Sequence, residues 1–300
     1  MVFMVWFFAS LLFSFFNSVT MLINQRFKLE GHLISGLRGV GVGIVSLPFL
    51  WIVEIPRGGV FWALIMLEAA ISTFFNARLY ESSSKFGAGA TSIISVLSVA
   101  FGVALWWAVD VDGFLALLGD AGVFAGVMAA LVAVSGGFWL IARSYVVAKN
   151  GAMSYMMPAV VALTAMMTTR KEIMEHAEFW TAIAVYCAVS IGISGVVNLS
   201  VFAVRSGCAK FCEVLGSRRT WKAGALMASA SLVTIFCGNW AAFYSPNPAY
   251  VSAITLLSPL WIMGIDRLAG RREKVPVWGM VVMLLGLLAL VFFGNAPLHT

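Results

Sequence analysis

The chain has 300 residues, of which 61% are hydrophobic and only 11% are charged, and its net charge is +6. Soluble domains carry about 25% charged residues, so this composition excludes a water-soluble globule. The charged residues cluster between apolar runs that approach the length of a bilayer crossing, which predicts an all-α integral membrane protein with several spans.

Ten apolar stretches bounded by charge, glycine or proline predict ten transmembrane helices, because about 20 apolar residues cross the hydrocarbon core. They are too long and too uniformly apolar for the strands of a membrane barrel. For the first stretch a signal peptide is the alternative, but it lacks a basic leading region, so a retained helix is expected. The predicted spans are 2–23, 34–53, 60–79, 88–109, 119–142, 151–169, 178–204, 222–244, 249–268 and 275–293.

Lysine and arginine fall mainly on one side of this topology. Of the 19 basic residues, only Arg57, Arg170 and Lys171 follow even-numbered spans, and the other 16 follow odd-numbered spans or, for Arg38, lie one turn inside the next helix. Because short basic loops stay cytoplasmic, we expect a multi-pass protein of the cell (inner) membrane with both termini outside. The basic excess therefore indicates topology and not nucleic-acid binding.

The chain divides into two predicted five-helix halves, residues 1–147 and 148–300. Residues 91–98, which open the fourth span, are similar to residues 251–258, which open the ninth. Because five is an odd number, equivalent helices of the two halves run in opposite directions, and the pattern predicts two inverted repeats. Such repeats are typical of alternating-access transporters, whose halves rock about a site near the bilayer midplane.

The second half carries a recognisable succession of motifs. Residues 239–260 contain the end of a helix, a turn of small residues and the pair Ser258-Pro259, and are followed by Gly270-Arg-Arg-Glu273 and a last helix with Gly279. This succession resembles the second EamA-type repeat of the drug/metabolite transporter (DMT) superfamily.

The first half resembles the same repeat more loosely. Arg38 lies where the family often has an arginine at the start of its second helix, residues 77–80 and 87–90 resemble the third-to-fourth connection, and Val99 stands in place of the proline. The resemblance implies a ten-helix metabolite carrier or exporter. Family members typically keep both termini in the cytoplasm, contrary to the charge distribution here, which leaves the direction of transport open.

Glu68 is the most distinctive polar residue inside a predicted span. It lies near the middle of the third span, and Ser72 and Asn76 follow on nearly the same helical face. A carboxylate at that depth is costly, so it predicts proton coupling or the binding of a cationic group. The alternative is a structural hydrogen bond to a neighbouring helix.

Further polar residues form stripes on other spans, and packing between helices or an interfacial aromatic belt is the alternative for each. Tyr155, with Pro158, is expected to form a kinked wall of a central cavity. The residues predicted to bind substrate are Ser14, Asn17, Glu68, Ser72, Asn76, Ser95, Ser98, Tyr155, Asn239, Trp240, Tyr244 and Thr255, with Glu68 also the coupling residue.

The sequence lacks a phosphate-binding glycine loop and a His-based metal motif, and its four cysteines read as ordinary thiols, so no cofactor, metal or enzymatic activity is predicted.

The expected function is secondary active transport of a small organic metabolite, as an exporter or importer, by proton coupling or exchange. Few fixed charges among the predicted residues favour a neutral or zwitterionic solute with an aromatic part. The alternatives are a lipid-modifying membrane enzyme, a channel or a non-transporting scaffold. The expected partners are the solute and membrane lipid, and the protein is a monomer or a homodimer.

Overall fold

The computed structural model describes residues 2–88, 91, 97–144, 151–245, 247–270 and 277–294. All regular elements within these ranges are helical. The longer helices are α1 (Val2–Phe27), α2 (Gly31–Ser46), α3 (Gly59–Phe86), α5 (Leu97–Val109), α7 (Ala121–Ser144), α8 (Ala152–Glu175), α10 (Gly192–Ser206), α12 (Arg218–Tyr244), α14 (Ser258–Leu268) and α15 (Val277–Gly294). The shorter elements are the 3-10 turn η1 (Leu47–Trp51), α6 (Val111–Gly119), α9 (Phe179–Val185), the π-helical turn η3 (Tyr186–Ile191), α11 (Cys208–Gly216) and α13 (Pro248–Thr255).

In the described part of the chain, seven helices are long and apolar enough to cross a membrane, or eight if α5 and α6 count as one bent span. This confirms the prediction of a helical protein with several helices long and apolar enough to cross a membrane. The apolar part of α15, residues 278–290, is shorter than a crossing. Helix α8 was predicted as residues 151–169 but continues to Glu175, with Arg170 and Lys171 buried inside the bundle.

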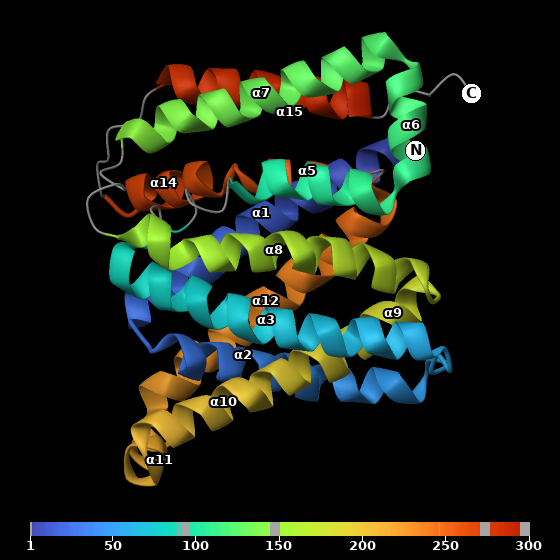
Figure 1. Cartoon of the computed structure of the whole chain (residues 1–300). Helices are drawn as coiled ribbons and strands as arrows, with labels where there is room; N and C mark the ends of the chain where they lie inside the picture. The colour runs from blue at the N-terminus through green and yellow to red at the C-terminus, as the bar shows by residue number, and fades with distance from the viewer. Residues whose placement is uncertain are drawn as a thin grey trace.

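The helices run back and forth along one common direction (Figure 1). The start of α1 and the end of α15 lie at one end of the bundle, and α1, α3, α10 and α14 all finish at the other. Each of those four helices carries a basic residue in its last turn, namely Arg26, Lys85, Arg205 and Arg267. The fold therefore gathers at one end the basic connections that the sequence placed together.

Helices α2 and α10 approach each other closely enough for their backbones to touch. A Cβ atom added to Gly195 would lie 2.4 Å from the amide nitrogen of Val40, and one added to Gly43 would lie 2.9 Å from the Cα of Gly192. Small residues allow such contact, which in a bilayer replaces the hydrophobic effect as a source of helix association.

Two of the helical segments are interrupted. Helix α6 turns by 104° from α5, and its N-cap is Asp110, whose carboxylate accepts a hydrogen bond from the backbone N–H of Gly113 at 3.0 Å. Residues 110–118 were expected to lie between two spans. Helix α13 ends at Thr255, before Pro259, which has no backbone N–H to donate.

The break between α13 and α14 is held by α1. The Ser18 hydroxyl donates to the backbone carbonyl of Ser258 at 3.2 Å, and the Ser258 hydroxyl donates to the carbonyl of Ser14 at 3.3 Å. These bonds join the two ends of the chain across 240 and 244 residues and satisfy polar groups at the interruption.

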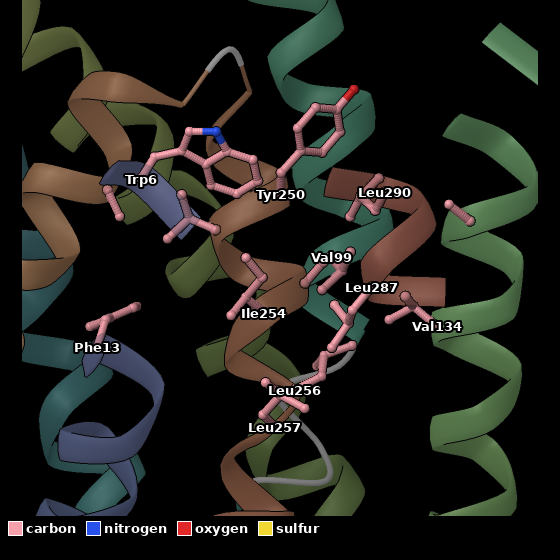
Figure 2. Packing of buried hydrophobic residues seen from close by; sticks show 14 of the residues in the cluster. Trp6, Phe13, Val99, Val134, Tyr250, Ile254, Leu256, Leu257, Leu287 and Leu290 are labelled. Atoms are coloured by element: carbon pink, nitrogen blue, oxygen red, sulfur yellow. The ribbon is translucent and has the colours of Figure 1, made fainter. Parts of the chain in front are cut away.

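Figure 2 shows how α13 contributes to the largest apolar cluster. Tyr250 and Ile254 of α13 lie in one buried cluster with Trp6 of α1, Val99 of α5 and Leu287 of α15. The interrupted segment is therefore enclosed by residues from both halves of the chain.

Candidate functional site

A polar cavity lies between α1, α2, α3, α8, α12 and α13. The space that the centre of a water molecule can occupy in it is about 50 Å³, which is enough for a few waters. Its lining includes the aromatic residues Phe13, Phe75 and Tyr80. Its polar lining is Asn17, Thr20, Arg38, Asn76, Arg170, Ser231, Thr234, Ser252 and Thr255.

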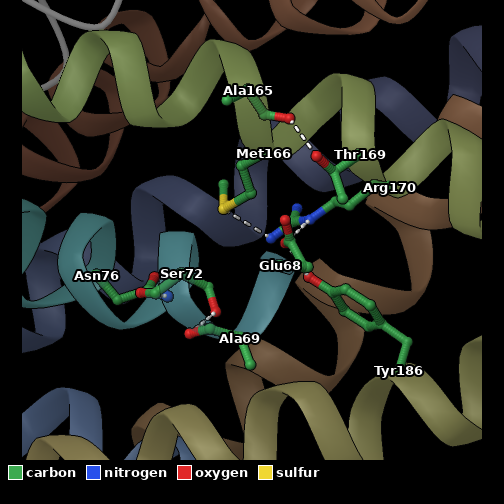
Figure 3. Close-up of polar contacts among 9 residues, drawn as sticks. All are labelled: Glu68, Ala69, Ser72, Asn76, Ala165, Met166, Thr169, Arg170 and Tyr186. Carbon is green, nitrogen blue, oxygen red and sulfur yellow. Dashed lines mark hydrogen bonds and ion pairs between the residues drawn. The ribbon is translucent and has the colours of Figure 1, made fainter. Parts of the chain in front are cut away.

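A buried ion pair lies beside this cavity, which Arg170 lines and Glu68 does not (Figure 3). The Nε atom of Arg170 donates to Oε1 of Glu68 at 2.9 Å, and the Tyr186 hydroxyl donates to the same oxygen at 2.9 Å. The Arg170 side chain is 5% exposed and that of Glu68 is 0% exposed. The second carboxylate oxygen of Glu68, Oε2, has no hydrogen-bond partner among the described residues.

Local structure places these three side chains together. Glu68 lies on α3 with Ser72 and Asn76 one and two turns further on, and the Asn76 amide donates to the carbonyl of Ser72 at 2.8 Å. Arg170 lies in the final part of α8, and Tyr186 opens the π-helical turn η3. A π turn inserts an extra residue into a helix and so rotates the side chains that follow, which is common at functional sites.

Arg38 is a second buried arginine at the cavity. Its Nε donates to the Ser231 hydroxyl at 2.8 Å, and its guanidinium lies 5.9 Å from the centre of the Tyr80 ring. The residue is 6% exposed and has no carboxylate within 4.0 Å in the described part of the protein. The cavity therefore presents two guanidinium groups, of which one is paired with Glu68.

Lys171, next to Arg170, has a structural role. Its ammonium donates to the carbonyls of Ser245 at 2.9 Å and Ala242 at 3.4 Å, and it pairs with Glu175 at 3.0 Å. These carbonyls lie at the end of α12, where backbone acceptors lack partners and the helix dipole favours a cation. Lys171 thus caps α12 and does not line the cavity.

Three of the residues predicted to bind substrate, Asn17, Asn76 and Thr255, line the cavity. Ser14 instead lies 3.4 Å from Ser258, oxygen to oxygen, at the helix break. The carbonyl of Ser98 accepts a hydrogen bond from Thr164 on α8. Glu68 and Ser72 are buried on the same stripe as Asn76. Ser95 lies outside the described residues.

The remaining predicted residues lie away from the cavity lining. Tyr155 contacts the guanidinium of Arg78, 4.5 Å from its ring centre, near the end of α3. Trp240 makes an edge-to-face contact with Phe179 and a tilted contact with the ring of Tyr244, and it lines a separate groove beside α1. Asn239 is fully buried, and both polar atoms of its amide lack partners within the described ranges.

Arg170 and Tyr186 were not predicted as site residues. Arg170 was predicted to lie in a connection because it follows an apolar run, but α8 continues through it to Glu175. The available signal was the single Glu68 in mid-span, because a buried carboxylate requires a cationic or hydrogen-bonding partner somewhere in the chain.

No group of three His, Cys, Asp or Glu side chains that could hold a metal ion occurs among the residues described by the structure. The four cysteines are free thiols; Cys187 and Cys237 are buried, and Cys208 and Cys212 are exposed on α11.

Comparisons with known proteins define the fold only. No family model matches the chain, and no curated protein matches it. A solved structure described as "Crystal structure of protein" is similar to this chain, with a TM-score of 0.57 and 13% sequence identity over 99% of both chains. The helical arrangement therefore has a counterpart among solved structures along its whole length.

Proposed function

We propose that this protein is a secondary active transporter, which moves a small organic solute across a membrane by alternating access. The observation that carries the proposal is the cavity between α1, α2, α3, α8, α12 and α13, which takes polar lining residues from both halves of the chain. A buried polar space inside an apolar bundle is costly, and in transporters it forms the solute site.

The pairing of helices supports ten spans arranged as two repeats. If α1 corresponds to α8 and α3 to α12, a two-fold exchange converts the α1–α12 contact into the α8–α3 contact, and both pairs pack together. The same exchange converts the contact between α5 and α8 into the contact that α13 and α14 make with α1. Two further packed pairs, α2 with α10 and α7 with α15, join elements that correspond to each other.

The interrupted crossing also supports a carrier. Transporter sites are typically formed where membrane helices are broken near their middle. Ser252 and Thr255, at the end of α13, line the cavity immediately before the break at residues 256–257. Because the cavity holds only a few waters in this conformation, entry of a solute requires the surrounding helices to move apart.

We further propose Glu68 as the coupling residue. The ionisable side chains in contact with it, among those described, are Arg170 of α8 and Tyr186 of η3. Protonation of Glu68 would break its charge pairing with Arg170 and release a guanidinium that lines the cavity. A Glu68→Gln variant is expected to lose the dependence of transport on a proton gradient.

Counterflow in reconstituted vesicles tests the proposed function. Vesicles preloaded with an unlabelled solute are expected to accumulate the labelled solute with saturable kinetics; amino acids, nucleosides, vitamins and quaternary amines form the screen. Linear flux would identify a channel, and no flux with any solute would contradict transport. Thr255→Val removes a hydroxyl from the cavity and is expected to slow exchange at least tenfold, whereas Ser200→Ala, on the exposed face of α10, is the matched control.

A further inference from the structure

We infer that the solute carries an anionic group, and that Arg38 binds it in the central cavity. This inference rests on the proposed function, because it names the class of solute that the cavity takes. It replaces the neutral or zwitterionic solute expected from the sequence, where the predicted binding residues included only one charged side chain, Glu68.

The charged groups that line the cavity are positive. Two guanidinium groups, those of Arg38 and Arg170, line the cavity, and no Asp or Glu does so in the described part of the chain. Glu68 pairs with Arg170 from behind this lining, at 2.9 Å. Arg38 is only 6% exposed and has no counter-ion among the described residues. Its guanidinium is nevertheless charged, because arginine is effectively always protonated in proteins. A buried unpaired charge is strongly unfavourable, so a bound anion would stabilise it.

Arg38 keeps hydrogen-bond donors that no described side chain uses. Arg38 uses Nε to donate to Ser231, and none of its other nitrogen atoms has a hydrogen bond to a described residue. Its Nη atoms are not fully buried, so they keep accessible surface. Arg38 lines the cavity, so a solute in the cavity can reach this guanidinium. A guanidinium with both Nη groups free suits the two oxygens of a carboxylate or a comparable oxyanion.

The cavity lining combines polar and aromatic groups. The hydroxyls of Thr234 and Thr255 supply further polar groups, and Phe13, Phe75 and Tyr80 supply aromatic surface. The solute that fits this distribution is a small organic anion with an apolar portion. The guanidinium of Arg38 lies near the face of Tyr80, which holds the charged group in place without consuming its donors.

Binding by the purified protein in detergent tests this inference with pairs of equal shape and different charge. The probes are benzoate against benzamide, and lactate against lactamide, with binding measured by thermal shift and calorimetry. We expect the wild type to bind benzoate or lactate at least tenfold more tightly than the matching amide. Equal binding within both pairs, or no response to either anion at millimolar concentration, overturns the inference.

Variants locate the binding group. Arg38→Gln is expected to abolish the preference for the anion, and Arg205→Gln, which removes the same charge from an exposed position on α10, is expected to retain it. An Arg38→Gln protein that keeps the preference overturns the assignment. If that variant does not fold, Arg38→Lys keeps the positive charge and is expected to keep a weaker preference; equal binding of anion and amide by folded Arg38→Lys also overturns it.

Two further outcomes separate this inference from the proposed function. Anion binding that depends on Arg38, with no counterflow for any solute, refutes the carrier and retains the site. Counterflow of a neutral solute without any preference for anions retains the carrier and refutes the site. A response to phosphatidylglycerol alone, with none to the soluble anions, assigns the oxyanion to a lipid headgroup and overturns the inference of an anionic solute.

Discussion

Glu68 and Arg170 lie 102 residues apart in the chain and form a buried ion pair, with Nε and Oε1 2.9 Å apart. The pair joins α3 of the first half to α8 of the second. Removing one partner leaves an uncompensated charge in an apolar interior, which costs about 3–5 kcal/mol, whereas removing both does not.

We therefore predict that Glu68→Gln and Arg170→Gln each lower the free energy of unfolding by about 3–5 kcal/mol, and that the double variant loses less than either. The measurement is unfolding in mixed detergent micelles, analysed as a double-mutant cycle. Strictly additive losses would show that the two side chains do not interact energetically.

Tyr186→Phe removes one of the two donors to Oε1 of Glu68. A hydrogen bond to a charged group contributes about 1.5–3 kcal/mol, so a loss of that size is expected in the same unfolding measurement. Tyr250→Phe is the control, because Tyr250 is also buried but its hydroxyl has no hydrogen bond to any described residue. Equal losses for the two variants would deny Tyr186 a role at Glu68.

Gly195→Ala is expected to separate α2 from α10. The new Cβ would lie 2.4 Å from Val40 N and 2.6 Å from the carbonyl carbon of Gly39, both of them backbone atoms. Overpacking of this kind costs about 1–3 kcal/mol. Gly264→Ala in α14 meets no atom within 4 Å and is expected to be neutral or stabilising by up to about 1 kcal/mol, because alanine favours a helix. A stable Gly195→Ala protein would contradict the close approach.

Stability below neutral pH is expected to depend on Glu178, which precedes α9. The backbone N–H of Thr181 donates to its carboxylate at 3.0 Å, and this bond lowers the pKa of Glu178 below its ordinary value of 4.5. A carboxylate with a lowered pKa stabilises the fold above its unfolded pKa, and this contribution disappears as the pH falls through the folded pKa.

The difference in melting temperature between wild type and Glu178→Gln should accordingly be constant from pH 7 to about pH 5 and shrink at lower pH. Melting curves across this range provide the measurement. A difference that grows as the pH falls would mean that the charged form of Glu178 is not the one that caps α9.

Native cysteines test the orientation predicted from the basic residues. Cys208 and Cys212 are exposed on α11, in a connection predicted to be cytoplasmic, and Cys187 and Cys237 are buried. A membrane-impermeant maleimide is therefore expected to label inside-out vesicles and not intact cells, and a Cys208→Ser/Cys212→Ser variant should lose the label. Labelling in intact cells would reverse the predicted orientation.

The sequence by itself determined that the protein is built from long apolar helices and that the basic residues at the ends of these helices share one side. Both properties depend on local composition. A run of about 20 apolar residues must cross a bilayer or be buried. Arg26, Lys85 and Arg205 could be assigned to one end of the bundle by counting spans, and the fold gathers them there. The stripe from Glu68 to Asn76 was likewise visible as a helical period.

Only the tertiary structure decided what those polar residues meet. The partner of Glu68 comes from a segment that local composition assigned to a connection, and Tyr186 reaches it from a π turn that no sequence period marks. Arg38 was predicted to lie one turn inside the second span, and only the packing of α2 against α12 encloses it beside Ser231. The physical reason is that pairing between helices depends on contacts more than 100 residues apart, whereas hydropathy and periodicity are properties of neighbouring residues.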